Sequence, residues 1–346
     1  MKIIVIDGQV LHSGNMDGIH RFMIEILSRL DRMIEGSSEL ELHLVHSNAD
    51  DIKNLTLKNI KVVALDSSKG RYHMKLVPEY VKQVGGIYCS MSNDAIRLPG
   101  SIFTIMDLIP INKQFKYPFK AKLRMRLTYM AMKKFHRRIV TISEESKKDI
   151  VNLIGIKEDH IDIVPCGHEH MDAIGSDDSI FETDSRIVKG GYYYAVGNQY
   201  PYKNYRWVVE AAKYNKDAVF VVAGGKLNIS EDIGLAGDNI IYVGRVSDEV
   251  NRSLMEGAKA FIHPSKLEGF GIPPMEALYL GTPAIVSSAS CLPEIYGDTV
   301  HYIDPDDAKV NLDDLLKEPV ESPEKLFEKY NWDKAARDWL NIFKSM

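Results

Sequence analysis

Short apolar runs alternate with stretches of helical periodicity along the whole chain, and this alternation is typical of a parallel α/β architecture. The first half contains seven predicted strands, at residues 3–6, 40–45, 60–65, 86–89, 102–105, 139–142 and 161–164. The second half contains six, at residues 192–196, 218–223, 239–243, 260–263, 283–287 and 300–303. Apolar positions at helical spacing predict helices that include residues 19–30, 119–137, 203–214 and 331–346.

The pattern breaks once, in the polar and glycine-containing stretch 168–190, which predicts a linker or surface loop. This break separates two predicted Rossmann-like domains, residues 1–167 and 191–328, and an amphipathic C-terminal helix follows at 329–346. Ligands of open parallel sheets bind beyond the carboxyl ends of the strands. We therefore expect the chemistry in loops that follow strands, at a cleft between the two domains.

Composition narrows the class of protein. The chain has 346 residues, 45% hydrophobic and 26% charged, as expected of a globular protein with about two domains. A net charge of −5 argues against a nucleic-acid-binding protein. Cys89, Cys166 and Cys291 lie far apart without metal-ligand spacing, so we expect free thiols in a reducing cytoplasm. The sequence opens on a strand pattern rather than a signal peptide, and it contains no apolar run of bilayer length.

The most informative motif is Glu268-Gly-Phe-Gly-Ile-Pro-Pro-Met-Glu276, which separates two carboxylates by eight positions. It follows a predicted strand and precedes a helix that Gly281 would end, so it predicts a glycine-rich turn at a helix N-terminus. Such a turn offers backbone N–H groups and a positive dipole end to an anion. A first-turn acid that stabilises the helix dipole would explain Glu276 but not Glu268. Two glutamates beside an anion site instead suggest a ligand with both phosphates and hydroxyls, such as a nucleotide-activated sugar.

Further segments form an ordered set with this motif. In the first half they are Gly18-Ile-His-Arg-Phe22, Asp107-Leu-Ile-Pro110 and Thr141 to Asp149. In the second half they are Val196 to Asn204, Tyr242 to Glu249, His263 to Glu276, Gly281-Thr-Pro283 and Leu292-Pro-Glu294. The set resembles the motifs of family-four retaining glycosyltransferases, and it covers most of the chain. The resemblance implies the GT-B fold, in which two Rossmann-like domains face each other across a cleft and the C-terminal helix crosses back to the first domain.

The resemblance also implies a role for each matched position. Glu276 would hold the ribose hydroxyls of a nucleoside diphosphate sugar, Glu268 would lie beside the transferring sugar, and Lys203 would bind the pyrophosphate. The implied catalytic residues are thus Glu268, Lys203 and Asp107. The implied donor-binding residues are Glu276, Gly269, Phe270, Gly271, Gly18, Asn198, Arg245 and Val246, of which the last two would face the base.

Sugar transfer passes through an oxocarbenium-like state while negative charge grows on the departing phosphate. A lysine and backbone amides can stabilise that charge, so we expect neither a metal ion nor a cofactor. The only Asp-x-Asp sequence, Asp304-Pro-Asp306, follows a predicted strand and is interpreted as a turn.

Three positions depart from the family pattern. Asn198 stands where an arginine is common, and losing such a cation costs roughly 1.5–3 kcal/mol, or about ten- to hundredfold in binding, unless Arg245 replaces it. Met106 replaces a common histidine, so that position could contact a sugar only through its backbone. Asp17 replaces a glycine, and a carboxylate near a diphosphate is unfavourable unless it points elsewhere or contacts the acceptor.

Several residues have simpler interpretations. Asp107 can cap a turn after its strand as readily as it can act in the cleft. Ser143 is better explained as the N-cap of a helix. His12, His20 and His263 lack metal-ligand spacing and are interpreted as structural or solvent-facing.

Residues 113–138 contain ten Lys or Arg and no acid. Apolar side chains recur there every four residues, at Phe119, Leu123, Leu127, Ala131 and Phe135. One interpretation is an amphipathic helix packed on the first domain with a solvated basic face. The other is attachment to an anionic membrane surface that carries a lipid-linked acceptor, and basic clustering in an acidic protein favours it.

The leading hypothesis is a retaining, metal-independent glycosyltransferase, cytoplasmic or peripheral on the inner face of the membrane. It would move a hexose-type sugar from a nucleoside diphosphate to a saccharide or lipid-linked acceptor in cell-envelope polysaccharide assembly. The alternative, motivated by Asn198, Met106 and Asp17, is a catalytically weak sugar-nucleotide-binding subunit of a heteromeric transferase. A nicotinamide-dependent oxidoreductase would fit the α/β pattern, but the first strand is not followed by GxGxxG.

Overall fold

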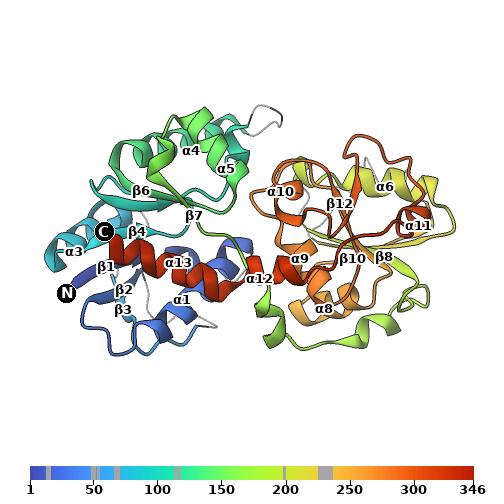
Figure 1. Ribbon diagram of the computed structural model, residues 1–346, viewed down its shortest axis with the longest axis horizontal. Helices are drawn as coiled ribbons and strands as arrows, with labels where there is room; N and C mark the ends of the chain where they lie inside the picture. The colour runs from blue at the N-terminus through green and yellow to red at the C-terminus, as the bar shows by residue number, and fades with distance from the viewer. Residues whose placement is uncertain are drawn as a thin grey trace. The chain divides into compact units, whose positions relative to one another are not determined.

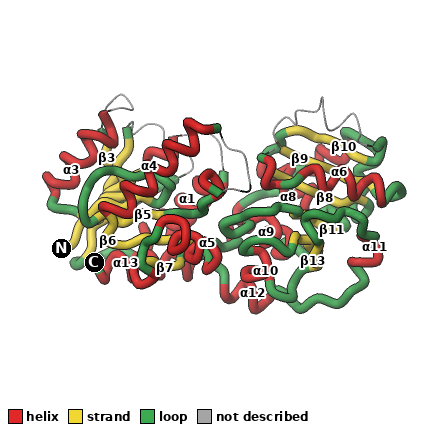
Figure 2. Tube along the Cα trace, turned by 90° about the horizontal axis from the view of Figure 1, so that it is seen from above, coloured by secondary structure: helices red, strands yellow, loops and turns green. Residues whose placement is uncertain are grey.

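The computed structural model describes residues 1–12, 17–47, 52, 55–65, 71–112, 114, 118–197, 200–224 and 237–346. The chain divides into two compact units. Unit 1 comprises Met1–Cys166 and Asn331–Met346, and unit 2 comprises Gly167–Tyr330. Each unit is built around one parallel β-sheet with helices packed against it (Figure 1, Figure 2).

The sheet of unit 1 has the strand order β3-β2-β1-β4-β5-β6-β7, and every neighbouring pair is parallel. Its strands are β1 (Lys2–Asp7), β2 (Leu40–His46), β3 (Lys61–Ala64), β4 (Ile87–Ser90), β5 (Ser101–Thr104), β6 (His136–Thr141) and β7 (Ile161–Ile163). Its α-helices are α1 (Gly18–Met33), α3 (Val77–Val84), α4 (Phe119–Phe135), α5 (Glu144–Asp149) and α13 (Trp332–Ser345). Shorter helical turns are η1 (Gln9–His12), η3 (Tyr72–Leu76), η4 (Ile109–Ile111), η5 (Ile150–Ile154) and η6 (Glu158–His160).

The sheet of unit 2 has the strand order β10-β9-β8-β11-β12-β13, again with parallel pairs throughout. Its strands are β8 (Tyr192–Gly197), β9 (Val219–Gly224), β10 (Ile240–Gly244), β11 (Ala260–His263), β12 (Ala284–Ser287) and β13 (His301–Ile303). Its α-helices are α6 (Tyr205–Tyr214), α8 (Asp248–Glu256), α9 (Ile272–Tyr279), α10 (Leu292–Tyr296), α11 (Leu312–Leu315) and α12 (Glu324–Lys329). Shorter turns are η7 (Glu169–Ala173), η8 (Asp178–Glu182) and η9 (Pro201–Lys203).

All thirteen predicted strands are present, and the prediction of two parallel α/β sheets is confirmed. Many boundaries differ from the prediction by one to three residues, and two of the shifts are described here. Strand β6 begins at His136 rather than at residue 139, and α6 begins at Tyr205 rather than at residue 203. Lys203 therefore ends the short turn η9, and the prediction that it lies in the first turn of α6 was wrong. The three cysteines are free thiols, as predicted, and all three are buried.

Alternate residues of the strands in unit 2 belong to two separate cores. Tyr193 and Ala195 of β8 pack with Trp207 of α6, whereas Tyr192 and Tyr194 pack in a cluster with residues of α8 and α9. Side chains of a strand point alternately to opposite faces, so α6 covers one face of this sheet, and α8 and α9 cover the other. This burial on both faces explains why the strands appear as continuous apolar runs in the sequence.

The C-terminal helix α13 packs against α1 within unit 1 (Figure 1). The Trp332 ring is completely buried, with its centroid 5.9 Å from that of Phe22. Arg29 Nε donates to Asp333 Oδ1 at 2.6 Å, and Lys2 Nζ donates to the carbonyl oxygen of Lys344 at 2.7 Å. No helix in the described residues has both the length and the apolar character needed to cross a bilayer.

Replacing Trp332 by alanine should leave a large void between α13 and α1. We expect the free energy of unfolding in urea to fall by about 3–5 kcal/mol. Arg337→Ala is the matched control, because Arg337 is exposed on the same helix and its loss should change stability by less than about 0.5 kcal/mol. Equal stabilities of the two variants would contradict the buried packing of α13.

Candidate active site

The glycine-rich turn joins β11 to α9, as the sequence predicts. Gly271 is the N-cap of α9 with φ of 84°, and a Cβ at this position would lie 2.7 Å from Leu292 Cδ2. Only glycine combines that backbone conformation with so close an approach. Pro273 and Pro274 follow in the first helical turn, and Gly281 with φ of 83° comes just after the helix ends.

The side chain of Phe270, in the middle of the turn, points into the protein. Phe270 is buried, and its ring packs edge-on against Tyr330 with centroids 5.4 Å apart. Pro273 and Pro274 carry no N–H, so the candidate donors for an anion are the amides of the turn itself, Gly269 to Gly271. The buried ring of Phe270 therefore anchors the turn. The amides of Gly269 to Gly271 are the candidate ligand-binding groups.

Glu268 and Lys203, which are 65 residues apart in sequence, form an ion pair. Lys203 Nζ donates to Glu268 Oε1 at 2.6 Å, and His263 Nε2 lies 3.0 Å from the same oxygen. The side chain of Glu268 is 9% exposed and that of Lys203 is 18% exposed. The structure thus brings two of the three predicted catalytic residues into direct contact, in a place that is nearly closed to water but still reachable.

Topology explains why these residues meet. In the sheet of unit 2, β8, β9 and β10 run to one side and β11, β12 and β13 run to the other, so the strand order reverses between β8 and β11. Loops that follow the two strands at such a switch point diverge and leave a crevice at their carboxyl ends. Lys203 follows β8, and Glu268 follows β11.

Local contacts hold the lysine turn against the glutamate turn. Asn204, which adopts a left-handed φ of 57°, donates through Nδ2 to the carbonyl oxygens of Pro264 at 3.1 Å and Pro305 at 2.8 Å. The N–H of Lys266 donates to the carbonyl oxygen of Tyr202 at 2.7 Å. Asparagine tolerates the left-handed region better than most residues, so Asn204 suits both tasks.

A third loop, after β12, holds the backbone of Glu268. Ser290 Oγ donates to the carbonyl oxygen of Glu268 at 2.9 Å and lies 3.3 Å from its N–H. Cys291 Sγ also donates to that carbonyl, at 3.3 Å. Ser290 has a left-handed φ of 57°, which is strained for a serine and is kept by these contacts. Sequence reasoning missed Ser290, because nothing local connects it to Glu268.

The electrostatics of the pair keep Glu268 ionised. Burial by itself raises the pKa of Glu268, but Lys203 and His263 outweigh it and hold the pKa far below the ordinary 4.5. Burial lowers the pKa of His263 below 6.5, against the opposing effect of Glu268. A neutral His263 that donates to the carboxylate must carry its proton on Nε2. Of the two predicted interpretations of His263, the structure excludes the solvent-facing one, because His263 is 2% exposed and its ring is bound to Glu268.

Glu276 lies on α9, where its side chain is 16% exposed. Its Oε1 is 2.8 Å from Nε2 of His170, whose side chain is 1% exposed. His170 belongs to η7, in the polar stretch 168–190 that the sequence predicts as a linker or loop. Sequence analysis missed this partner, and no local signal marks it.

The other predicted donor-binding residues of unit 2 lie elsewhere or outside the described residues. Arg245 is exposed in the bend after β10, and Val246 is half-buried against the core that α8 covers. No contact that joins either residue to Glu268 or Glu276 is seen in the described part of the chain. Asn198 lies outside the described residues.

In unit 1, Asp17 and Ser143 are helix N-caps. Gly18 is exposed at the start of α1, and the carboxylate of Asp17 accepts from the N–H groups of Ile19 and His20, each at 3.0 Å. Asp17 therefore serves as the N-cap of α1. Ser143 caps α5 through a 3.1 Å bond from the N–H of Ser146, as predicted.

The loop after β5 is tied to neighbouring elements by its backbone. Asp107 Oδ1 accepts from the N–H of Ile109 at 3.0 Å, so the turn-capping interpretation of Asp107 is confirmed and its cleft role stays a prediction. The N–H of Met106 donates to Asn93 Oδ1 at 3.0 Å, and its carbonyl oxygen accepts from Ser146 Oγ at 3.1 Å. The backbone of Met106 is thus already engaged within the protein.

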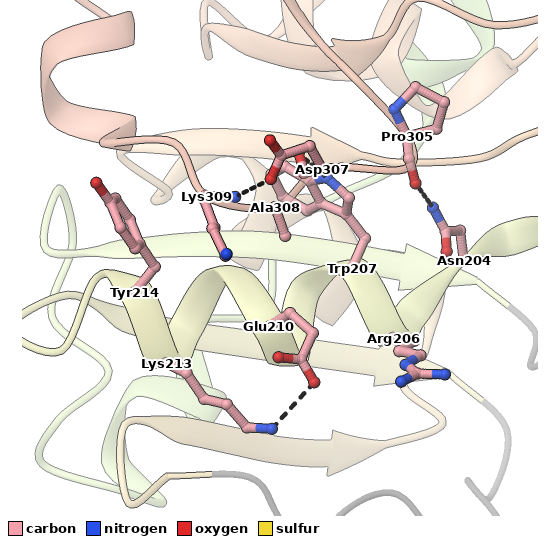
Figure 3. Close-up of a pocket in the computed structure, with 10 residues that line it drawn as sticks. All are labelled: Asn204, Arg206, Trp207, Glu210, Lys213, Tyr214, Pro305, Asp307, Ala308 and Lys309. Carbon is pink, nitrogen blue, oxygen red and sulfur yellow. Dashed lines mark hydrogen bonds and ion pairs between the residues drawn. The ribbon is translucent and has the colours of Figure 1, made fainter.

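A surface hollow of about 330 Å³ lies beside α6 and includes Asn204 in its wall (Figure 3). Some of its polar groups bond to one another or to the backbone nearby. Lys213 Nζ pairs with Glu210 at 3.0 Å, and Trp207 Nε1 donates to the carbonyl oxygens of Asp304 and Asp307. Because the lining of this hollow contains none of the predicted catalytic or donor-binding residues, we place the candidate site at the glycine-rich turn.

Comparison with known proteins finds similarity to glycosyltransferases. Residues 179–337 match the model of the family Glycosyl transferases group 1. The O-antigen chain mannosyltransferase RfbU of Salmonella typhimurium is 26% identical over 233 residues, which are 64% of this chain and 62% of that protein. The O-antigen chain mannosyltransferase B of Escherichia coli is 24% identical over 228 residues, or 60% of each chain. The chain thus spans about three fifths of the length of the curated relatives it matches.

A solved structure decides the fold. Anabaena Alr3699/HepE, in complex with UDP and glucose, matches over 100% of both chains with a TM-score of 0.74 at 14% identity. This chain has the GT-B fold. The predicted fold class is confirmed, and the likeness at this identity concerns the fold alone. The residues that the family model matches, 179–337, include the glycine-rich turn of unit 2.

Replacing Lys203 by methionine should strip the buried Glu268 carboxylate of its cation. We expect the free energy of unfolding at pH 7 to fall by about 3 kcal/mol, the lower end for a broken buried pair, because Lys203 is partly exposed. Adding Glu268→Gln should recover much of the loss, since the charge that needs the lysine is then gone. Chemical denaturation of the two variants measures both effects.

The pH dependence provides the control for this pair. A folded pKa below the ordinary 4.5 means that the Glu268 contribution is present above pH 4.5 and is lost as the pH falls toward the folded pKa. The stability difference between the wild type and Glu268→Gln should therefore shrink as the pH falls from 7 to about 3. A difference that stays constant over this range would contradict the ion pair.

Proposed function

We propose that this chain is a glycosyltransferase that takes a hexose-type sugar from a nucleoside diphosphate and transfers it to a saccharide or lipid-linked acceptor. The observation that carries the proposal is the contact of Lys203 with Glu268 at the glycine-rich turn, with Glu276 on the helix that follows. The names of the relatives support a role in cell-envelope polysaccharide assembly, since RfbU and mannosyltransferase B are O-antigen chain mannosyltransferases.

Lys203 is the proposed stabiliser of the leaving diphosphate. Its ammonium group has three donors, and Glu268 takes one of them. A diphosphate seated against the amides of Gly269 to Gly271 would take the others, so charge that grows on the leaving oxygen meets a cation already in place. Preorganised charge of this kind needs no rearrangement during the reaction. The proposed reaction uses neither a metal ion nor a cofactor.

Glu268 is proposed to act as a permanent anion. Its pKa is far below neutral pH, so it holds no proton to give to a leaving group. This argues against a general-acid role, which an acid and base pair in a hydrolase would require. An ionised carboxylate can instead accept hydrogen bonds from sugar hydroxyls and stabilise positive charge on the anomeric carbon. We propose that transfer occurs with retention and without an enzymic nucleophile.

Sugar nucleotides should stabilise the wild-type chain, and Glu276→Ala should remove most of that effect. A ligand at 100 times its Kd adds about 2.7 kcal/mol to the stability of the folded state. Loss of charge-assisted bonds to the ribose should weaken binding by roughly ten- to hundredfold. Thermal unfolding with UDP-, GDP-, ADP- and CDP-sugars measures both variants.

Glu268→Gln should behave differently, because it alters the reacting centre more than the nucleotide site. We expect turnover to fall on the order of a hundredfold, with a smaller change in donor affinity and no effect of EDTA on the wild type. Glu210→Ala, in the hollow beside α6, is the matched control and should leave both quantities unchanged. Wild-type-like turnover in both glutamate variants would overturn the proposal. Binding without hydrolysis or transfer would leave the alternative of a catalytically weak binding subunit.

We further propose that α4 attaches unit 1 to an anionic membrane surface, where a lipid-linked acceptor would be found. The buried side of α4 is formed by Tyr129 and Met132. Four large apolar side chains point the other way, with exposed fractions of 78%, 46%, 58% and 64% at Phe119, Leu123, Leu127 and Met130. At 3.6 residues per turn these four lie within an arc of roughly 80°. The predicted apolar stripe therefore faces solvent over most of its length, and the interpretation that packs it on the domain was wrong there.

Basic residues border this stripe on both sides. On the helical wheel, Lys122 and Arg126 lie along one border, Lys120 lies just beyond the other, and Lys134 lies within the arc at the C-terminal end of the helix. An exposed apolar stripe between cations fits the boundary between lipid headgroups and acyl chains. A neutral membrane would bind the apolar stripe but would not attract the basic residues, so we propose an anionic surface.

Neutralising the border should release the protein from anionic vesicles. Each basic residue near such a surface contributes about 1 kcal/mol, so K122Q/R126Q/K134Q should weaken binding by roughly a hundredfold. F119S/L127S/M130S should weaken it as well, by removing the buried apolar area. Flotation with phosphatidylcholine vesicles, with and without phosphatidylglycerol, measures the effect.

The matched control is K216Q/K309Q/K325Q, which removes the same charge from exposed positions of unit 2. It should float like the wild type. Equal flotation of the α4 charge variant and this control would show that net charge alone matters, and the proposed surface would be abandoned.

A further inference from the structure

The segment that opens unit 2 is fixed to the body of the unit at several points. The His168 ring donates through Nδ1 to the carbonyl oxygen of Tyr330 at 2.9 Å. It also packs on the rings of Tyr279 and Phe327, with centroids 4.5 and 4.7 Å away. A stretch with the composition of a linker is therefore held like a part of the core.

The turn η7 that follows is tied to α8 and α9. Arg252 of α8 donates through Nη1 to the carbonyl oxygens of Met171 and Ile174. Tyr279 of α9 donates to Asp172 Oδ1 at 2.7 Å. His170 lies within this turn, so its ring is set in place before any ligand arrives.

His170 makes a second link from η7 to α9, and this one ends at the proposed ribose ligand. Its Nε2 is 2.8 Å from Glu276 Oε1. An ionised carboxylate only accepts hydrogen bonds, so Nε2 is the protonated nitrogen. The side chain of His170 is 1% exposed, whereas that of Glu276 is 16% exposed. Any contact with a ligand from solvent is therefore made by the glutamate, and the histidine acts through it.

We propose that His170 is a positioning residue, which holds one oxygen of Glu276 so that the other oxygen, Oε2, receives the ribose hydroxyls of the donor. A free glutamate side chain has three rotatable torsions, and ordering it on binding costs affinity. A carboxylate already held by a buried imidazole avoids that cost. The inference rests on the proposed function of Glu276 as the ribose ligand. It gives a functional role to His170, which lies in the stretch 168–190.

The test measures ribose preference rather than affinity alone. Titration calorimetry gives the Kd of the tightest binder among UDP, GDP, ADP and CDP, and the Kd of its 2′,3′-dideoxy form. We expect the wild type to prefer the ribose form by about tenfold or more. H170L and H170N should reduce that preference to about twofold or less, because Glu276 is then no longer oriented. H170Q should keep most of it, since a glutamine amide can also donate to Oε1.

His43→Leu is the matched control, because His43 is also buried and its Nε2 is 2.7 Å from a carboxylate oxygen of Glu41, in unit 1. It should lose stability but keep the ribose preference. A merely structural role for His170 would weaken both nucleotides equally, leave the preference intact and overturn the inference. If H170L does not fold, H170N decides by the same criterion.

The remaining outcomes separate this inference from the function on which it rests. A wild type that binds none of the four nucleoside diphosphates overturns the proposed function and this inference with it. A wild type that binds without ribose preference overturns the role of Glu276 and therefore that of His170. A preference retained in both H170L and H170N overturns the positioning role alone and leaves the proposed function standing.

Discussion

The buried ion pair between Lys203 and Glu268 is the interaction on which the candidate site depends. Removing two such charges from water costs several kcal/mol for each ion, so they persist only with close and well-oriented partners. The 2.6 Å contact supplies one partner, and His263 supplies a second donor to the same oxygen. A buried carboxylate alone would take up a proton, and a buried amine alone would lose one. Each of the two loops therefore needs the other to keep its charge.

The sheet of unit 2 makes this pairing possible. Strands β8, β11 and β12 are neighbours, and the loops after them carry Lys203, Glu268 and Ser290 in turn. Because the strands are parallel, all three loops leave the same edge of the sheet, and the reversal of strand order between β8 and β11 separates the first loop from the second. Lys203, Glu268 and Ser290 therefore meet at this edge, although they are far apart in the sequence. Lys203 pairs with the Glu268 carboxylate, and Ser290 binds the Glu268 backbone.

The permanent negative charge of Glu268 decides which kind of chemistry it is suited to. A carboxylate whose pKa lies far below neutral pH is suited to accepting hydrogen bonds and opposing positive charge, and it is a poor proton donor. This separates the proposed transferase from a hydrolase, although both can carry paired glutamates. Glu276 is bound by His170, whereas Glu268 is bound by Lys203. The two carboxylates of the motif therefore have different partners.

The sequence by itself determined the strands, the parallel sheets and the glycine-rich turn. These features depend on local chemistry: apolar runs that suit burial on both faces, and a φ of 84° at Gly271 that a side chain would resist. Tertiary structure alone decided the rest. Glu276 and His170 are 106 residues apart, and no periodicity links them. The sequence of α4 predicts an apolar stripe, but the side of the helix that is buried is the opposite one, which carries Tyr129 and Met132. Contacts between distant segments depend on the directions in which loops leave the sheet, and these directions cannot be predicted from the local sequence.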